Sequence, residues 1–251
     1  TFNMFLLAII DLSNRKQRIL RKAAFKHAVT GSLTVLMIGL AVFFMLANID
    51  LKVGPVGIDS LILIAVYIVA VRIIQKENSP ASHHTEKIVV PQGTPALWKG
   101  ILGFTLAAAA LVVITPVMVS NANIIADSTG LRTTFIGTTL VALVTSLPEL
   151  VTTLAAVKIG AADMAIGNLF GSNLFNMFAF GLTDFFYPQG RFLAAIDPAF
   201  LLIGITGLLL TSLGLIGNLV KLEKRAWFIE IDALVIFLFY LVSLWLIYLR
   251  A

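Results

Sequence analysis

Glu149 is the one acidic residue that lies deep within an apolar stretch of this sequence. Near the centre of a bilayer a carboxylate costs at least ~2.5 kcal/mol, so Glu149 needs a partner there. It directly follows Pro148, whose missing N–H group leaves carbonyl groups about one turn earlier, near Val144 and Thr145, without their usual donors. These carbonyl groups, the hydroxyls of Thr145 and Ser146 and the carboxylate form an all-oxygen cluster. Hard cations such as Ca2+ or Na+ prefer such ligands.

The next apolar stretch supplies a second polar wall. Its polar side chains recur every four residues and therefore share one helix face: Asn168, Ser172 and Asn176, with Asn173 beside them. Gly167 and Gly171 form a GxxxG pair that lets another helix approach closely. Ordinary interhelical hydrogen bonding would explain this stretch taken alone, and a proton relay is an alternative role for Glu149. Together the two stretches favour a cation site, because an anion site would require Arg or Lys in mid-span and the sequence has none there.

Composition indicates where these stretches lie. The chain has 251 residues, of which 59% are hydrophobic and only 12% charged, and its mean hydropathy is +0.99. Charged residues make up about 25% of a soluble domain, so we expect an integral membrane protein. No cysteine is present, which excludes disulfides and thiolate chemistry. The spans contain no Ser/His pair, HExxH motif or paired aspartates, so we expect neither an enzyme nor a cofactor.

Apolar runs predict an all-α fold with one partial and seven full membrane spans. The partial span is 1–12, and the full spans are 28–47, 56–74, 98–119, 133–157, 164–187, 198–217 and 229–249. A single longer polar segment, 75–97, separates three N-terminal spans from five C-terminal ones. The acidic residues other than Glu149 fall in predicted loops, Asp59 among them, or at span ends, where we expect water to reach Asp11 and Asp184.

The basic residues predict the orientation of these spans. Assigned alternately, the loops carry 14 Lys and Arg on one side and four on the other, namely Lys52, Arg132, Arg191 and Arg250. The richer side is cytoplasmic by the positive-inside rule. The 75–97 loop is then cytoplasmic and the C-terminus external, in a plasma or inner membrane. This asymmetry explains the net charge of +5 without a nucleic-acid partner.

Two other charged features have simple explanations. The basic run 15–22 serves as a topology signal, with binding of anionic lipid as the alternative. The adjacent His83 and His84 are read as solvated loop residues, with metal binding as the alternative.

An internal repeat links the two halves of the chain. The segment 1–12, TFNMFLLAIIDL, and the segment 174–185, LFNMFAFGLTDF, match at Phe, Asn, Met, Phe and Asp with an offset of 173. They are the first and sixth predicted spans. Spans separated by an odd number of crossings run in opposite directions, so this pattern predicts the inverted repeat of secondary transporters.

The residues around Glu149 resemble a known family, the cation/Ca2+ exchanger superfamily that includes the sodium/calcium exchangers. Its C-terminal repeat reads G-x-T-x-x-A-x-x-T-S-x-P-E and then A-x-G-N-x-x-G-S-N-x-F-N. Residues 137–149, GTTLVALVTSLPE, and 165–176, AIGNLFGSNLFN, match it nearly throughout. The resemblance implies a ten-helix fold of two inverted five-helix halves that exchanges Ca2+ against Na+ or H+ by alternating access.

The same resemblance implies roles for individual residues. Glu149 would be the central Ca2+ ligand and Thr145 a ligand through its backbone carbonyl. Ala142, Ser146 and Ser172 would belong to flanking Na+ sites. Asn176 stands where electrogenic exchangers often carry Asp, which leaves the counter-ion open. Asn3 is its counterpart in the first repeat.

The first repeat is only partly present, so we expect about two and a half upstream helices to complete the site. Residues 1–74 would be the remainder of the N-terminal half, 75–97 the cytoplasmic loop and 98–251 the C-terminal half with the ion-binding motif. The expected function is a Ca2+/Na+ antiporter in the lipid bilayer. The alternatives are a H+/Ca2+ exchanger and a non-transporting membrane scaffold subunit with this fold.

Overall fold

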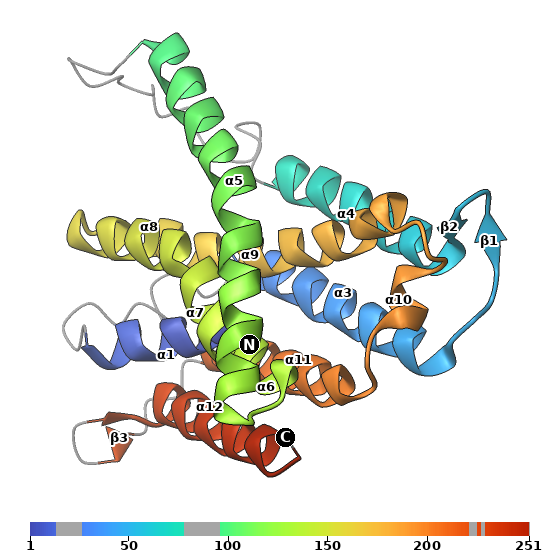
Figure 1. Ribbon diagram of the computed structural model, residues 1–251. Helices are drawn as coiled ribbons and strands as arrows, with labels where there is room; N and C mark the ends of the chain where they lie inside the picture. The colour runs from blue at the N-terminus through green and yellow to red at the C-terminus, as the bar shows by residue number, and fades with distance from the viewer. Residues whose placement is uncertain (14–26, 78–95, 221–224, 227–228, 251) are drawn as a thin grey trace.

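The computed structural model describes residues 1–13, 27–77, 96–220, 225–226 and 229–250. This part of the chain is built from helices and two short hairpins (Figure 1). The basic run 15–22 and the pair His83–His84 lie outside the described residues, so their predicted roles stay predictions.

The helices follow the apolar runs of the sequence closely. In chain order they are α1 Phe2–Ser13, α3 Ala28–Ala47, α4 Ile58–Glu77, α5 Leu97–Thr129, α6 Thr133–Ile136, α7 Ala142–Thr145, α8 Leu147–Lys158, α9 Ala162–Leu182, α10 Phe192–Ala195, α11 Ala199–Val220 and α12 Ile231–Arg250, with a π-helical turn η2 at Gly137–Val141 and a 3-10 turn η3 at Thr183–Phe186. The hairpins pair β1 Lys52–Val53 with β2 Val56–Gly57, and β3 Arg225–Ala226 with β4 Ile229–Glu230.

Among the described residues, five helices are long and apolar enough to cross a membrane: α3, α4, α5, α11 and α12. The bent pair Thr133–Thr145 and Leu147–Lys158 makes a sixth if it is one span. The protein is therefore an all-α, multi-pass membrane protein. The count of seven full spans stays a prediction, because the polar helix α9 is not among these five.

Helix α9 lies at the centre of the packing. It contacts α1, α3, α4 and α8, while α11 packs on α3 and α12, and α1 packs on α12. One apolar cluster joins α1 and α9 to α12 through buried side chains such as Met4, Phe170 and Ile236, and a second joins α3 and α4 through Met37 and Leu63. Residues that carry the ion-site motif thus stand on a helix that is held from several sides.

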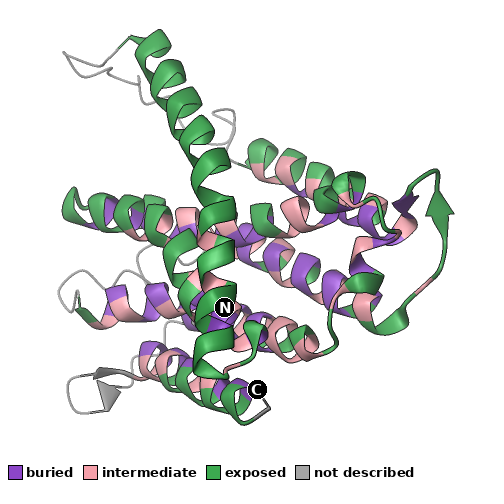
Figure 2. Ribbon diagram, viewed as in Figure 1, coloured by how far each residue is buried: buried purple, intermediate pink, exposed green. Residues whose placement is uncertain are grey.

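Helix α5 contrasts with the rest because it lies across the other helices and is exposed along nearly its whole length (Figures 1 and 2). It contacts only the α6–η2 segment extensively. The sequence predicts a span over 98–119 followed by a loop, but the helix continues to Thr129. No Gly or Pro interrupts 120–129, and the helix ends where Gly130 adopts the left-handed conformation with φ 71°.

The two hairpins recur with the same spacing as the sequence repeat. Each strand of β3 and β4 begins 173 residues after its counterpart in β1 and β2, and α12 likewise begins and ends 173 residues after α4. The hairpins lie at opposite ends of the helix layer (Figure 1). An extended repeat of secondary structure therefore accompanies the short sequence match.

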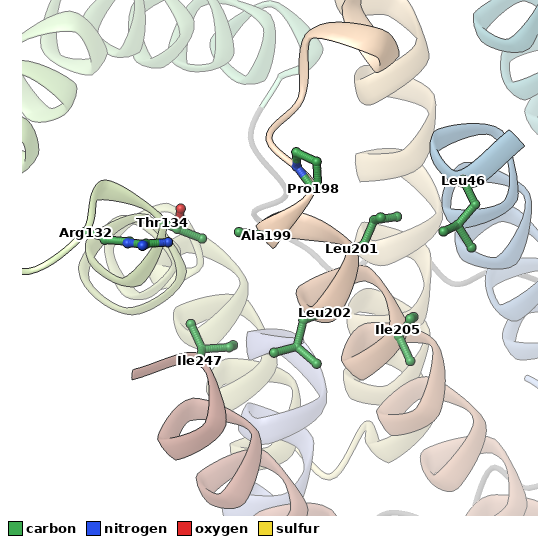
Figure 3. A pocket seen from close by; sticks show the side chains of 9 residues that line it. All are labelled: Leu46, Arg132, Thr134, Pro198, Ala199, Leu201, Leu202, Ile205 and Ile247. Atoms are coloured by element: carbon green, nitrogen blue, oxygen red, sulfur yellow. The ribbon is translucent and has the colours of Figure 1, made fainter. Parts of the chain in front are cut away.

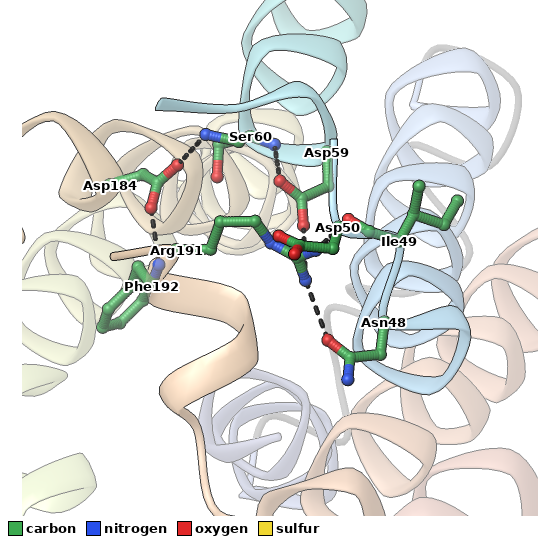
Figure 4. A network of polar contacts seen from close by, with 9 residues as sticks. Asn48, Ile49, Asp50, Asp59, Ser60, Asp184, Arg191 and Phe192 are labelled. Atoms are coloured by element: carbon green, nitrogen blue, oxygen red, sulfur yellow. Dashed lines mark hydrogen bonds and ion pairs between the residues drawn. The ribbon is translucent and has the colours of Figure 1, made fainter. Parts of the chain in front are cut away.

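At one end of this layer a buried cluster of charges ties three connections together (Figure 4). Asp184 is 1% exposed, and its carboxylate accepts hydrogen bonds from the backbone N–H groups of Gly57 at 2.6 Å and Phe192 at 2.5 Å. The expectation that water reaches Asp11 and Asp184 is wrong, because they are only 2% and 1% exposed. Asp184 is buried because it satisfies the backbone of two neighbouring connections.

Arg191 is the cation of this cluster, here called the Arg191 cluster. Its guanidinium lies 3.7 Å from the carboxylates of Asp50 and Asp59. It also donates to the side chain of Asn48 at 2.9 Å and to the carbonyl of Ile49. Asp59 is 1% exposed in the first turn of α4, so its expected loop position is wrong. The cluster joins the end of α3, the start of α4 and the start of α10.

Candidate ion-binding site

The helix that leads to Glu149 is interrupted twice. The turn at Gly137–Val141 is π-helical, which is a frequent feature of functional sites. A few residues later Ser146 leaves the helical conformation, with φ −95° and ψ 4°, and the two segments meet at a bend of 44°. Pro148 explains this break, because it cannot donate to the carbonyl of Val144 and is well tolerated at the start of the new helix α8.

Glu149 stands in the first turn of α8 and faces α9. Its Oε1 accepts a hydrogen bond of 2.6 Å from the hydroxyl of Ser172. Its Oε2 is buried and has no hydrogen-bond partner among the described residues. A bare carboxylate oxygen at such a depth is costly unless a positive charge or a donor meets it.

Asn168 fixes the helix that carries Glu149. Its amide nitrogen lies 2.9 Å from the hydroxyl oxygens of both Thr152 and Thr153 and 3.3 Å from the backbone carbonyl of Glu149. Sequence reasoning placed Asn168 on this wall but did not include Thr152 and Thr153. Their positions three and four residues after Glu149, on the same helix face, were the available signal.

The other predicted residues on this helix lie before the break. Thr145 is exposed, and its hydroxyl donates to the carbonyl of Val141 at 2.8 Å, so the side chain is engaged within its own helix. Ser146 is half-buried at the bend itself. Ala142 is half-buried and packs against the apolar cluster of α1, α9 and α12. In the part of the chain that the structure describes, none of these three side chains forms a hydrogen bond with the Glu149 carboxylate, and their ion-binding roles stay predictions.

The asparagines of the repeat separate into a buried pair and an exposed residue. Asn3 donates through its amide to the side-chain oxygen of Asn173 at 3.0 Å, and the two are 3% and 6% exposed. This bond links α1 to α9 directly beside Ser172. Asn176, the repeat counterpart of Asn3, is exposed one turn further along α9. The structure thus brings Asn3 to Asn173, a contact that the offset of the repeat does not predict.

The two glycines of the GxxxG pair have different surroundings. A methyl group added at Gly167 would lie 2.9 Å from the imidazole of His27, so this glycine admits the start of α3. At Gly171 such a group would meet nothing within 4 Å. The expected close helix approach is therefore confined to Gly167 among the described residues.

The charge of the site comes from a single carboxylate. No three His, Asp or Glu side chains converge anywhere in the described ranges. Glu149 is instead surrounded by hydroxyl and amide groups, with Ser172 beside its carboxylate and Asn168, Thr152 and Thr153 around its helix turn. Such a site can offer one negative charge and several neutral oxygens to a hard cation.

Comparison with known families agrees with this chemistry. A family model described as "Sodium/calcium exchanger protein" matches residues 99–249, which is more than half of the chain. The chain belongs to this family. The superfamily that the motifs resemble is thereby confirmed, and the protein is a member of a family of transporters.

Individual relatives cover the chain only in part. Sodium/calcium exchanger MaX1 of Methanosarcina acetivorans is 44% identical over 91 residues, which are 36% of this chain and 26% of that protein. Putative antiporter CaxA of Alkalimonas amylolytica is 38% identical over 90 residues, or 36% of this chain and 28% of the relative. Inner membrane protein YrbG of Escherichia coli is 40% identical over 81 residues, which are 32% and 23% of the two chains. The matches thus span between a fifth and a third of these relatives, and no solved structure matches.

Proposed function

We propose that this protein is a secondary active antiporter that exchanges Ca2+ against Na+ across a membrane by alternating access. The observation that carries the proposal is the buried Oε2 of Glu149, which has no hydrogen-bond partner among the described residues. A Ca2+ ion is the cargo that this oxygen and its neutral neighbours would bind. The names of relatives such as MaX1, a sodium/calcium exchanger, support the same ion pair.

In this proposal the residues around Glu149 have different roles. Glu149 binds Ca2+ directly and the Ser172 hydroxyl orients its carboxylate. Thr145 contributes its backbone carbonyl, since its hydroxyl is already engaged with Val141. Ala142, Ser146 and Ser172 would belong to flanking Na+ sites. The bend at Ser146 would let these groups turn toward either side as the cargo changes.

The half-site requires a second half. Thr145, before the break, and Asn176, one turn beyond Ser172, are both exposed. One carboxylate neutralises only half the charge of Ca2+. We propose that helices of an N-terminal repeat cover this face and supply a second carboxylate, with Asn3 near the site. The recurrence of hairpins and helices at an offset of 173, at opposite ends of the helix layer, supports an inverted arrangement of the repeats.

Flux measurements on the full-length protein in proteoliposomes test the proposal. Ca2+ uptake is expected when an outward Na+ gradient is imposed, and to be absent without it. Glu149→Gln keeps the size of the side chain and removes its charge, so it should abolish uptake. Wild-type uptake by this variant would remove Glu149 from the site, and absence of flux in the wild type under every gradient would favour a scaffold subunit.

Exchange of Ca2+ against H+ is a second candidate, and Asn176 favours it. The amide of Asn176 contributes no charge where a carboxylate would, so the site has fewer negative charges to bind Na+ when the emptied site returns across the membrane. A pH gradient that drives Ca2+ uptake in the absence of Na+ would select this candidate.

For Na+ exchange, a site with two carboxylates predicts nearly electroneutral transport, and Asn176→Asp is expected to make the flux voltage-dependent or to slow it.

The charge asymmetry supports an orientation that can be tested separately. We propose that Lys158, at the end of α8, faces the cytoplasm and that Asn121, on the exposed end of α5, faces outside. The absence of native cysteine makes Lys158→Cys and Asn121→Cys clean reporters for an impermeant thiol reagent on intact cells. Labelling of Asn121→Cys alone is expected, and labelling of Lys158→Cys alone would reverse the orientation.

A further inference from the structure

A small cavity lies where four helix ends meet (Figure 3). Its volume is about 270 Å3. The walls come from the ends of α3 and α12, the beginning of α11 and the residues that lead into α6, with Leu46, Ile247, Leu202 and Arg132 as representatives. Pockets for small ligands usually measure about 300–1,000 Å3, so this one suits part of a larger molecule.

The lining has the polarity of a lipid rather than of a soluble ligand. Apolar side chains of α3, α11 and α12 form most of it, and Arg132 is the one charged residue that the described part of the chain contributes. Arg132 is exposed and forms no ion pair with the described residues. Figure 3 shows Arg132 and Leu46 on opposite sides of the lining, with Leu202 and Ile247 between them and lower in this view. The cation of Arg132 suits the phosphate of an anionic lipid, and the apolar lining suits the first methylene groups of its acyl chains.

The cavity also lies at the depth where headgroups are found. Helices α3, α11 and α12, which are long and apolar enough to cross a membrane, all have an end there. Trp245 and Tyr248, in the last turns of α12, are 59% and 51% exposed. Exposed Trp and Tyr near the end of a span mark the boundary between hydrocarbon and headgroups. Arg132 therefore stands at the level of lipid phosphates.

A second apolar cavity carries a charge of the opposite sign. It measures about 580 Å3 and is lined by apolar side chains of α3, α9, α10 and α11, with Asp197 as the one charged residue among the described residues around it. An acidic group repels a phosphate, so this larger apolar cavity is unsuited to an anionic lipid. The two neighbouring cavities thus differ in the sign of their one charge.

We infer that the Arg132 cavity is a binding site for an anionic phospholipid, whose phosphate pairs with Arg132 and whose acyl chains run along Leu202 and Ile205. Glu149 is not among the residues that line this cavity. Binding there would fix the start of the α6–α8 segment against α11 and α12, because Arg132 immediately precedes α6. A basic residue near the membrane surface contributes about 1 kcal/mol to the binding of anionic lipid, which is about fivefold in affinity.

Native mass spectrometry of the purified full-length protein with added lipid tests this inference. We expect phosphatidylglycerol to bind about fivefold more tightly than phosphatidylcholine with the same acyl chains. Arg132→Gln should reduce phosphatidylglycerol binding to the level of phosphatidylcholine, while Arg132→Lys retains the preference. The matched control is Lys52→Gln, which removes an exposed cation outside the cavity and should change nothing.

Two further measurements distinguish the contribution of the acyl chains from that of the phosphate. Ala199→Phe narrows the cavity and should weaken the binding of both lipids, and inorganic phosphate should not displace phosphatidylglycerol. Unchanged lipid preference in Arg132→Gln would overturn the inference. Full displacement of the lipid by inorganic phosphate would also overturn it, because the occupant would then be a free anion. So would a wild-type dimer that Ala199→Phe dissociates, because the occupant would then be a second copy of the chain.

Discussion

The Arg191 cluster and the Glu149 site both bury carboxylates, but they neutralise them differently. In the Arg191 cluster, Oδ2 of Asp59 has no hydrogen-bond partner among the described residues but lies 3.7 Å from a guanidinium of the same chain. Asp184 accepts two backbone hydrogen bonds. At Glu149 one oxygen accepts from Ser172 and the other has no hydrogen-bond partner among the described residues. Carboxylates satisfied by their own chain stabilise a fold. A carboxylate that is half satisfied is suited to a cation from outside.

The largest effect on stability is expected at Arg191. Arg191→Gln leaves Asp59 buried without its cation, and loss of one partner from a buried ion pair lowers the free energy of unfolding by about 3 kcal/mol or more. Thermal unfolding in detergent measures the loss, and Lys52→Gln is the surface control. Glu149→Gln should leave the unfolding temperature nearly unchanged. If Arg191→Gln and Glu149→Gln lowered the unfolding temperature equally, the Arg191 cluster and the Glu149 site would not differ in their contribution to stability.

Asp184 should give a smaller loss of stability. The N–H groups of Gly57 and Phe192 bond to different oxygens of Asp184, so Asp184→Asn removes one charge-assisted hydrogen bond and weakens the other. Each is worth about 1.5–3 kcal/mol when made to a charged group. Because an amide keeps one acceptor oxygen, we expect a loss of about 2 kcal/mol in the same unfolding assay. A variant as stable as the wild type would show that these bonds do not hold the connections together.

Ser172 should affect transport rather than stability. Its hydroxyl donates to Glu149, and a hydrogen bond to a charged group of about 1.5 kcal/mol corresponds to a tenfold change in affinity. We expect Ser172→Ala to raise the half-saturating Ca2+ concentration about tenfold in flux assays. The matched control is Ser212→Ala, because the Ser212 hydroxyl bonds only within its own helix α11. Equal effects of the two variants would contradict the role of Ser172.

The smallest effect is expected at Thr152. Thr152→Val removes one of the oxygens near the Asn168 amide but leaves Thr153 and the Glu149 carbonyl. One neutral hydrogen bond is worth about 1 kcal/mol, so Ca2+ affinity should fall about fivefold. Thr183→Val, at the far end of α9, serves as the control in the same flux assay. A loss as complete as that of Glu149→Gln would mean that Thr152 itself binds the ion.

The sequence predicts the helices well because the signal in a membrane protein is strong. Apolar runs predicted most of the helices, Pro148 predicted the break before Glu149, and the spacing of 168–176 predicted the polar helix face. The hydrogen bond from Ser172 to Glu149 was not predicted. Helix α5 was predicted too short, since the polar residues 120–129 resemble a loop although nothing in them stops a helix. Asp59 and Asp184 were predicted to lie near water. Their burial depends on Arg191 and on the backbone of distant connections, which no local pattern reveals.

The hydrogen bond between Asn3 and Asn173 has a consequence for synthesis of the chain. The two residues are 170 positions apart, and ribosomes add about 5–20 residues per second. Asn3 therefore waits about 10–30 s before its partner has been made. In hydrocarbon an unsatisfied amide costs several kcal/mol. The Asn3 amide therefore needs another polar partner during that interval, and the final packing of α1 on α9 has to wait until α9 has been made.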